Sequence, residues 1–176
     1  IVIEEVRVVA KILSGKEVAA SLKNRLTEEV NRLKSKGMTP KLSIVMVGDR
    51  PDSASYIKGA VKRCESVGVE CDVKQMPEDT TQEQFLQVLD ELNKDKSVNA
   101  IMIMRPLPSQ ISEDVVKYKI SPEKDVDCFS PINVSKVMSS EEGGFAPCTP
   151  SAVMEILKYY GIELRSKKAV IIGRSM

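Results

Sequence analysis

Apolar residues recur along the chain at two different spacings, which predict strands separated by helices. Short, nearly continuous apolar runs, such as LSIVMV at residues 42–47, are typical of strands that are covered on both faces. Runs of this length are too short for helices of ordinary size and are bounded by glycine, proline or polar residues. The predicted strands cover residues 42–47, 69–76, 98–104 and 168–172.

Helices are predicted between these strands. Apolar residues three and four positions apart over residues 16–36 predict an amphipathic helix, which Gly37 is expected to end. A second helix is expected to be capped by Asp52 or Ser53 and to stop at Gly68. Further helices are predicted from Thr80 or Thr81 with Phe85, Leu89 and Leu92 on one face, over residues 112–119 and over residues 151–160, whereas residues 120–150 are expected to be mostly loop.

The alternation of strands and helices predicts the fold class. Strands joined by helices pair in parallel through right-handed crossovers, so we predict an α/β fold, a three-layer domain with helices on both faces of a parallel sheet. The last predicted strand leads into Gly173, Arg174 and Ser175, which is typical of the first turn of a nucleotide-binding unit. We therefore expect the start of a Rossmann-type domain, with the rest of that domain beyond Met176.

Composition and charge narrow the classes of function. The chain of 176 residues is 42% hydrophobic and 29% charged, as expected of a globular protein. Its 26 basic and 25 acidic residues give a net charge of +1, which provides no general attraction for nucleic acid or an anionic membrane. No apolar run approaches the length of a spanning helix, so neither a nucleic acid nor a membrane is expected as a partner.

The residue types that are missing or few also exclude chemistry. The sequence has no histidine, which excludes a Ser-His-Asp triad, a Cys-His pair and imidazole metal ligands. The four cysteines form no C-x-x-C pair, so no metal site is expected. We interpret them as reduced thiols of a cytoplasmic protein. They are Cys64, Cys71, Cys128 and Cys148.

Six segments occur in an order and spacing that resemble the methylenetetrahydrofolate dehydrogenase/cyclohydrolase family. They are residues 10–19, 51–69, 105–111, 122–133, 144–157 and 167–175. The resemblance covers essentially the whole chain and implies a folate-binding domain over residues 1–150. Residues 151–176 would then be an inter-domain helix and the first strand of a Rossmann-like domain that binds NADP or NAD. Family membership also implies a homodimer for the full-length protein and tetrahydrofolate as the carrier of the substrate.

The resemblance assigns roles to particular residues. Tyr56 matches the tyrosine that packs against the folate ring system, and is therefore expected to be a catalytic and substrate-binding residue. Its phenol combines a flat apolar face with a polar tip, which suits that contact. Asp127 matches the aspartate that binds the pterin. A carboxylate suits this role because it can accept both a ring N–H and the neighbouring amino group. The matching residues of the rigid loop along the folate are Pro106, Leu107 and Pro108.

The neighbouring motifs suggest both scaffold and cofactor roles. Asp125 is expected to cap a turn or to pair with Lys124. The turn over residues 147–150 is expected to be scaffold, with Thr149 as a possible helix cap and no nucleophilic role for Cys148. Gly173, Arg174 and Ser175 match the dinucleotide loop of the family, where they would contact phosphate and where Arg174 would suit the 2′-phosphate of NADP.

Two departures from the family change the expected chemistry. The family has a lysine four residues after the tyrosine and a glutamine directly before its L-P-L-P, and these positions are Ala60 and Met104 here. The lysine is the acid-base group of the cyclohydrolase step, and Lys58 and Lys62 would point to the opposite helix face. Hydride transfer needs no protein base, so we predict a dehydrogenase whose cyclohydrolase activity is weak or lost.

Two other interpretations remain open. In one, the protein is still bifunctional and another group replaces the lysine. In the other, it is a catalytically dead folate-binding module, which the missing lysine and glutamine favour and which Tyr56 and Asp127 argue against.

Overall fold

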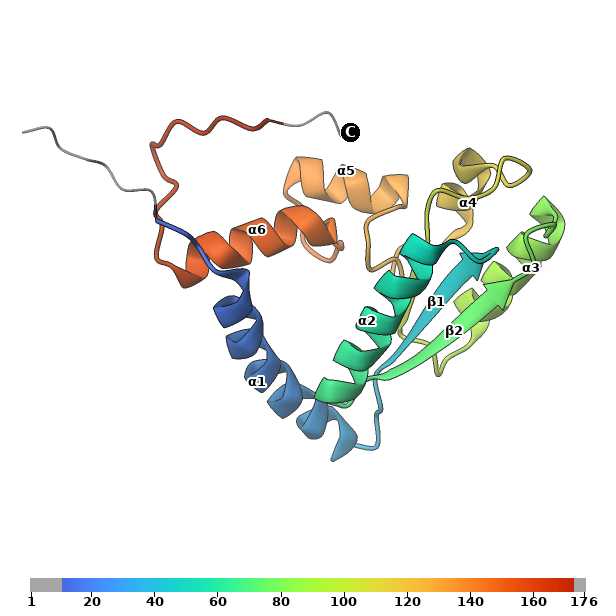
Figure 1. Cartoon of the computed structure of the whole chain (residues 1–176), viewed down its shortest axis with the longest axis horizontal. Helices are drawn as coiled ribbons and strands as arrows, with labels where there is room; N and C mark the ends of the chain where they lie inside the picture. Colours follow the sequence, from blue (N-terminus) through green and yellow to red (C-terminus); the bar gives the residue numbers. More distant parts are fainter. Residues whose placement is uncertain (1–10, 173–176) are drawn as a thin grey trace, which may run out of the picture.

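The structure, a computed structural model, describes residues 11–172 and has six helices and three strands in that range (Figure 1). Within these residues no helix combines the length and the apolar composition that crossing a bilayer would require. In chain order the elements are α1 (Gly15–Lys34), β1 (Lys41–Val47), α2 (Pro51–Val67), β2 (Glu70–Met76), α3 (Gln82–Lys94), β3 (Ala100–Ile103), α4 (Glu113–Lys119), α5 (Pro131–Ser139) and α6 (Cys148–Tyr159).

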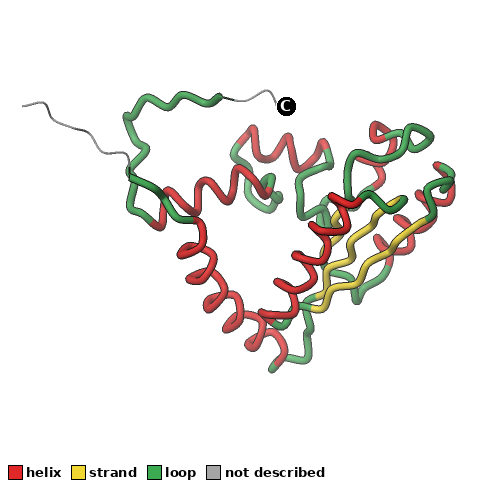
Figure 2. Tube along the Cα trace, in the orientation of Figure 1, coloured by secondary structure: helices red, strands yellow, loops and turns green. Residues whose placement is uncertain are grey.

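The three strands, yellow in Figure 2, form one sheet. They are parallel and lie in the order β2-β1-β3. The central strand β1 pairs with β2 over its whole length, from Lys41↔Glu70 to Val47↔Met76, and with β3 from Leu42↔Ala100 to Val45↔Ile103. β1 is buried from Ser43 onward, as expected of a strand with a neighbour on each side. The predicted parallel pairing is therefore confirmed.

Alternate residues of β1 supply two cores, one on each face of the sheet. Val45 and Val47 pack with Phe85 and Leu89 of α3 and with Val116 of α4. On the opposite face, Ile44 and Met46 pack with Ile57 of α2. The sheet thus has helices on both faces, which confirms the predicted three-layer α/β class. α1 packs on α2 and also reaches α6, and in Figure 1 these three helices outline a triangle beside the sheet.

The N-terminal caps of two helices can be compared with those predicted from the sequence. α3 begins with a capping box, in which Thr81 accepts the Gln84 N–H and the Gln84 side chain accepts the Thr81 N–H. For α2 the predicted caps Asp52 and Ser53 are wrong: the N-cap is Arg50, two or three residues earlier, and proline follows it. Proline suits the first helical position because it has no N–H and its φ is already helical.

The structure differs from the predictions in two further ways between residues 120 and 160. Residues 120–150 are mostly loop, as predicted, but they also contain α5, which their proline and glycine content did not indicate. Pro131 opens α5 at its first position and the Ser130 side chain accepts the Ile132 N–H. Thr149 is not a cap, since α6 already begins at Cys148 with Pro147 at the N-cap.

The predicted strand over residues 168–172 is not formed in this structure. These residues have no regular secondary structure, and Val170, Ile171 and Ile172 are 87%, 93% and 98% exposed. A strand needs a pairing partner, and no segment within residues 11–172 pairs with this one. Gly173, Arg174 and Ser175 lie outside the described residues.

Candidate active site

The carboxyl edge of the sheet gathers most of the predicted site residues. Met104 continues β3 there, and its N–H bonds to the carbonyl of Val45 at 2.9 Å. An isolated parallel bridge between Ile101 and Asp125 extends the sheet beyond β3. Asp127 is two residues past that bridge, in the turn that directly follows it.

Helix α2 carries Tyr56 and Ala60 one turn apart on one side. Tyr56 is 57% exposed, so its ring is available to a ligand. Ala60 is partly buried and packs against the cluster of Ile44, Met46 and Ile57. Lys58 and Lys62 are exposed, as the helical periodicity predicted, and neither can take the place of a lysine at position 60.

Met104 packs against the same apolar cluster as Ala60. The two positions are 44 residues apart in sequence, yet the crossover from α2 to β3 brings both to one face of the sheet. Neither side chain can donate or accept a proton. The structure therefore places the two departures from the family on the same apolar cluster.

The loop after β3 is held by residues that the sequence did not single out. Its peptide bond between Arg105 and Pro106 is cis. The N–H of Leu107 donates to Oε1 of Glu113 at 3.0 Å, and Nη1 of Arg105 lies 3.9 Å from the other oxygen of Glu113. The Arg105 guanidinium also lies over the ring of Phe129, 4.5 Å from its centroid. Arg105 replaces the first leucine of the family L-P-L-P, and this replacement could have identified it from the sequence. No feature of the sequence pattern indicated Glu113.

Asp125 has the structural role expected of it. It is 1% exposed, and its carboxylate accepts the N–H groups of Phe129 at 2.9 Å and Ser130 at 2.8 Å and the side-chain amide of Asn133 at 2.9 Å. It therefore caps the turn that carries Asp127, as predicted. The alternative pairing with Lys124 is not formed, because that ammonium donates to backbone carbonyls at the end of α3.

Asp127 is half-buried next to the start of α6. Its Oδ1 accepts the N–H of Cys148 at 3.4 Å, and the Cys148 thiol donates to the carbonyl of Val126 at 3.4 Å. Partial burial of the thiol and the Asp127 carboxylate beside it raise the pKa of Cys148 to about 11. Burial, with Asp125 and Asp127 nearby, also raises the pKa of Cys128. Both groups are thiols at neutral pH, which agrees with the absence of a predicted nucleophilic role.

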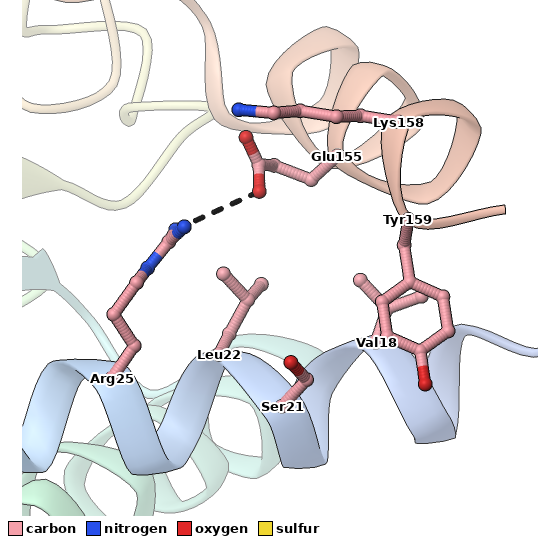
Figure 3. A pocket seen from close by; sticks show the side chains of 7 residues that line it. All are labelled: Val18, Ser21, Leu22, Arg25, Glu155, Lys158 and Tyr159. Atoms are coloured by element: carbon pink, nitrogen blue, oxygen red, sulfur yellow. Dashed lines mark ion pairs between the residues drawn. The ribbon is translucent and has the colours of Figure 1, made fainter. Parts of the chain in front are cut away.

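Two cavities in the described part of the chain are lined by other residues. One of about 260 Å³ lies between α1 and α6, where Arg25 and Glu155 are 3.7 Å apart (Figure 3). The other, of about 520 Å³, lies between the end of β2 and α3. No predicted site residue lines either cavity. Among residues 11–172, no three histidine, cysteine or acidic side chains come together in a way that could hold a metal ion.

Two family models match the chain. Residues 13–127 match the catalytic domain of tetrahydrofolate dehydrogenase/cyclohydrolase, and residues 147–176 match the NAD(P)-binding domain of the same enzymes. The first match includes Tyr56, Ala60, Met104 and Asp127. The second includes the residues of the predicted dinucleotide loop.

Individual relatives agree with these matches. The bifunctional protein FolD of Alkaliphilus oremlandii is 51% identical over 167 residues, which are 95% of this chain and 59% of that protein. The crystal structure of the bifunctional FolD of Campylobacter jejuni is similar with a TM-score of 0.91 and 43% identity, covering 94% of this chain and 58% of that one. The FolD of Trypanosoma brucei, solved with NADP cofactor and an inhibitor, gives a TM-score of 0.84 at 35% identity, covering 90% of this chain and 54% of that one. The chain thus spans 58–59% of the length of curated relatives such as the FolD of Alkaliphilus oremlandii.

Proposed function

The chain belongs to the tetrahydrofolate dehydrogenase/cyclohydrolase family, and on this premise we propose that the protein oxidises 5,10-methylenetetrahydrofolate to 5,10-methenyltetrahydrofolate with NADP or NAD. In this proposal residues 1–150 form the folate domain, and residues 151–176 are the inter-domain helix and the first part of the cofactor domain. The family resemblance also supports a homodimer for the complete protein. The bifunctional relatives support a role in one-carbon folate metabolism.

The folate would bind along the carboxyl edge of the sheet. Tyr56 offers its exposed ring to the planar part of the folate, where stacking fixes the plane of the reacting carbon. Pro106, Leu107 and Pro108 provide a rigid wall, because the two prolines each fix φ. The Asp127 carboxylate would accept the amino group and ring N–H of the pterin, which sets its orientation.

The cofactor residues are proposed on their chemistry. A glycine backbone, a guanidinium and a hydroxyl, as supplied by Gly173, Arg174 and Ser175, are suitable donors for the phosphates of a dinucleotide. The bound nicotinamide supplies the hydride acceptor, so the described residues of this chain need only bind and orient the folate.

The cyclohydrolase step is proposed to be weak or lost. Attack of water on the methenyl carbon requires a group that moves a proton, and loss of such a group costs about 10²–10⁴-fold in rate. The observation that carries this proposal is the shared packing of Ala60 and Met104 on one apolar cluster. The bifunctional relatives favour the second candidate, an enzyme in which another group does the proton transfer.

A coupled absorbance assay on the longest available form of the protein tests the proposal. With methylenetetrahydrofolate and NADP, or NAD in parallel, we expect reduced cofactor to form while the methenyl product accumulates and decays only at its uncatalysed rate. Rapid enzymatic decay of the methenyl product would establish the bifunctional candidate instead. Folate binding without any reduced cofactor would indicate the catalytically dead binding module.

Replacing Asp127 by asparagine is expected to raise the KM for methylenetetrahydrofolate by roughly 10–100-fold, since a charged acceptor for two donors is lost. The asparagine is nearly isosteric, so stability should change little. Asp90→Asn on α3 is the matched control, because Asp90 is an exposed carboxylate paired with Lys94 far from this edge. A KM within about twofold of the parent protein would exclude Asp127 from substrate binding.

A further inference from the structure

The Pro-Leu-Pro segment has one backbone donor in three residues. Pro106 and Pro108 have no N–H, so only Leu107 can tie this segment to its surroundings through a backbone N–H. That N–H is partly buried and donates to Oε1 of Glu113, the first residue of α4, at 3.0 Å. The Glu113 carboxylate therefore accepts the single backbone donor that the segment has.

The same carboxylate is connected to the turn that carries Asp127. Its second oxygen lies 3.9 Å from Nη1 of Arg105, and the Arg105 guanidinium lies 4.5 Å from the centroid of the Phe129 ring. The N–H of Phe129 in turn donates to the buried Asp125 carboxylate at 2.9 Å. A continuous series of contacts thus runs from the proline segment to the turn around Asp127.

We propose that Glu113 is a positioning residue, which fixes the distance between the Pro106–Pro108 segment and Asp127 and so sets the affinity for the folate. The proposal rests on the proposed function, because it concerns two parts of the proposed folate site. Glu113 need not touch the substrate: it acts through Leu107 on one side and through Arg105 and Phe129 on the other. Arg105 stands where the family has leucine, so this arm of the arrangement is a feature of this chain.

Because Arg105 and Glu113 are partly exposed, a positioning role of Glu113 can be distinguished from a contribution to the stability of the fold. The side chains of Arg105 and Glu113 are 44% and 37% exposed. Ion pairs at such exposure contribute little to the free energy of folding. Variants at Glu113 should therefore remain folded, and an effect on the folate site can be measured without loss of the native structure.

The test compares three variants in the longest form of the protein. Glu113→Ala is expected to raise the KM for methylenetetrahydrofolate about tenfold while kcat stays within about twofold, because binding is lost and chemistry is not. Hydrogen exchange of the Leu107 amide should become about tenfold faster. Glu113→Gln keeps an oxygen that can accept the Leu107 N–H but has no charge for Arg105, so it should restore slow exchange and part of the affinity.

Asp114→Ala is the matched control, since Asp114 is the next residue of α4, is exposed and pairs with Lys117. It should leave KM and Leu107 exchange unchanged. An unchanged KM for Glu113→Ala in an active parent protein would overturn the proposal, as would a loss of kcat equal to the rise in KM. If the parent protein itself neither binds folate nor reduces the cofactor, the proposed function fails first, and the positioning role fails with it.

Discussion

Replacing Ala60 by lysine together with Met104 by glutamine is expected to raise the rate of methenyltetrahydrofolate hydrolysis by about 10²–10⁴-fold. Ala60 follows Tyr56 by one helical turn and packs on the same apolar cluster as Met104, so the two new side chains would lie near each other. The lysine stem can lie along Ile44 and Met46, while partial burial lowers the pKa of its amine toward the range useful for proton transfer. The glutamine would hydrogen-bond the amine and orient it.

Single and control substitutions distinguish a gain in hydrolysis caused by proton transfer from one caused by the added bulk of the side chain. Ala60→Met adds comparable bulk without a proton donor and should leave hydrolysis at the uncatalysed rate. Ala60→Lys alone should give an intermediate gain, because Met104 cannot orient the amine. Hydrolysis is measured as the decay of methenyl absorbance in the absence of cofactor. A double variant that is no faster than Ala60→Met would show that the apolar cluster is not the site of the missing step.

The regular part of the fold was predictable because its signals are local. The spacing of Phe85, Leu89 and Leu92 and the cap at Thr81 predicted α3, and the apolar run of β1 predicted a central strand. α5 escaped prediction because its apolar residues do not form a core stripe: Ile132 and Met138 are 54% and 82% exposed. The segment over residues 168–172 has the composition of a strand, but pairing depends on a partner that local sequence does not specify.

The candidate site likewise contains residues that the sequence could identify and one that it could not. Tyr56, Asp127, Ala60 and Met104 could be picked out because the family resemblance gave each a position, and their roles remain predictions. Glu113 could not be picked out, because its contact with Leu107 exists only once the loop after β3 folds back on α4. Resemblance thus identifies residues that touch a ligand more readily than residues that hold those residues in place.

Replacing Asp125 by alanine is expected to lower the free energy of unfolding by about 3–5 kcal/mol. The carboxylate is 1% exposed and accepts three donors, the N–H groups of Phe129 and Ser130 and the amide of Asn133. Alanine leaves the N–H groups of Phe129 and Ser130 without their acceptor, and each such donor costs about 1–3 kcal/mol. The Asn133 amide loses one acceptor but keeps the carbonyls of Pro122 and Asp125. The loss should be visible as a lower urea midpoint at an unchanged slope.

Asp125→Asn and Glu123→Ala make this measurement specific to the buried network. Asparagine keeps one acceptor oxygen but turns an amide donor toward the remaining N–H groups, so its destabilisation should approach that of alanine. Glu123 is exposed two residues away, and its replacement should change stability by less than about 0.5 kcal/mol. Equal stability of Asp125→Ala and Glu123→Ala would contradict the structural role of Asp125. Since the same network holds the turn that carries Asp127, we also expect Asp125→Ala to weaken folate binding before the protein unfolds.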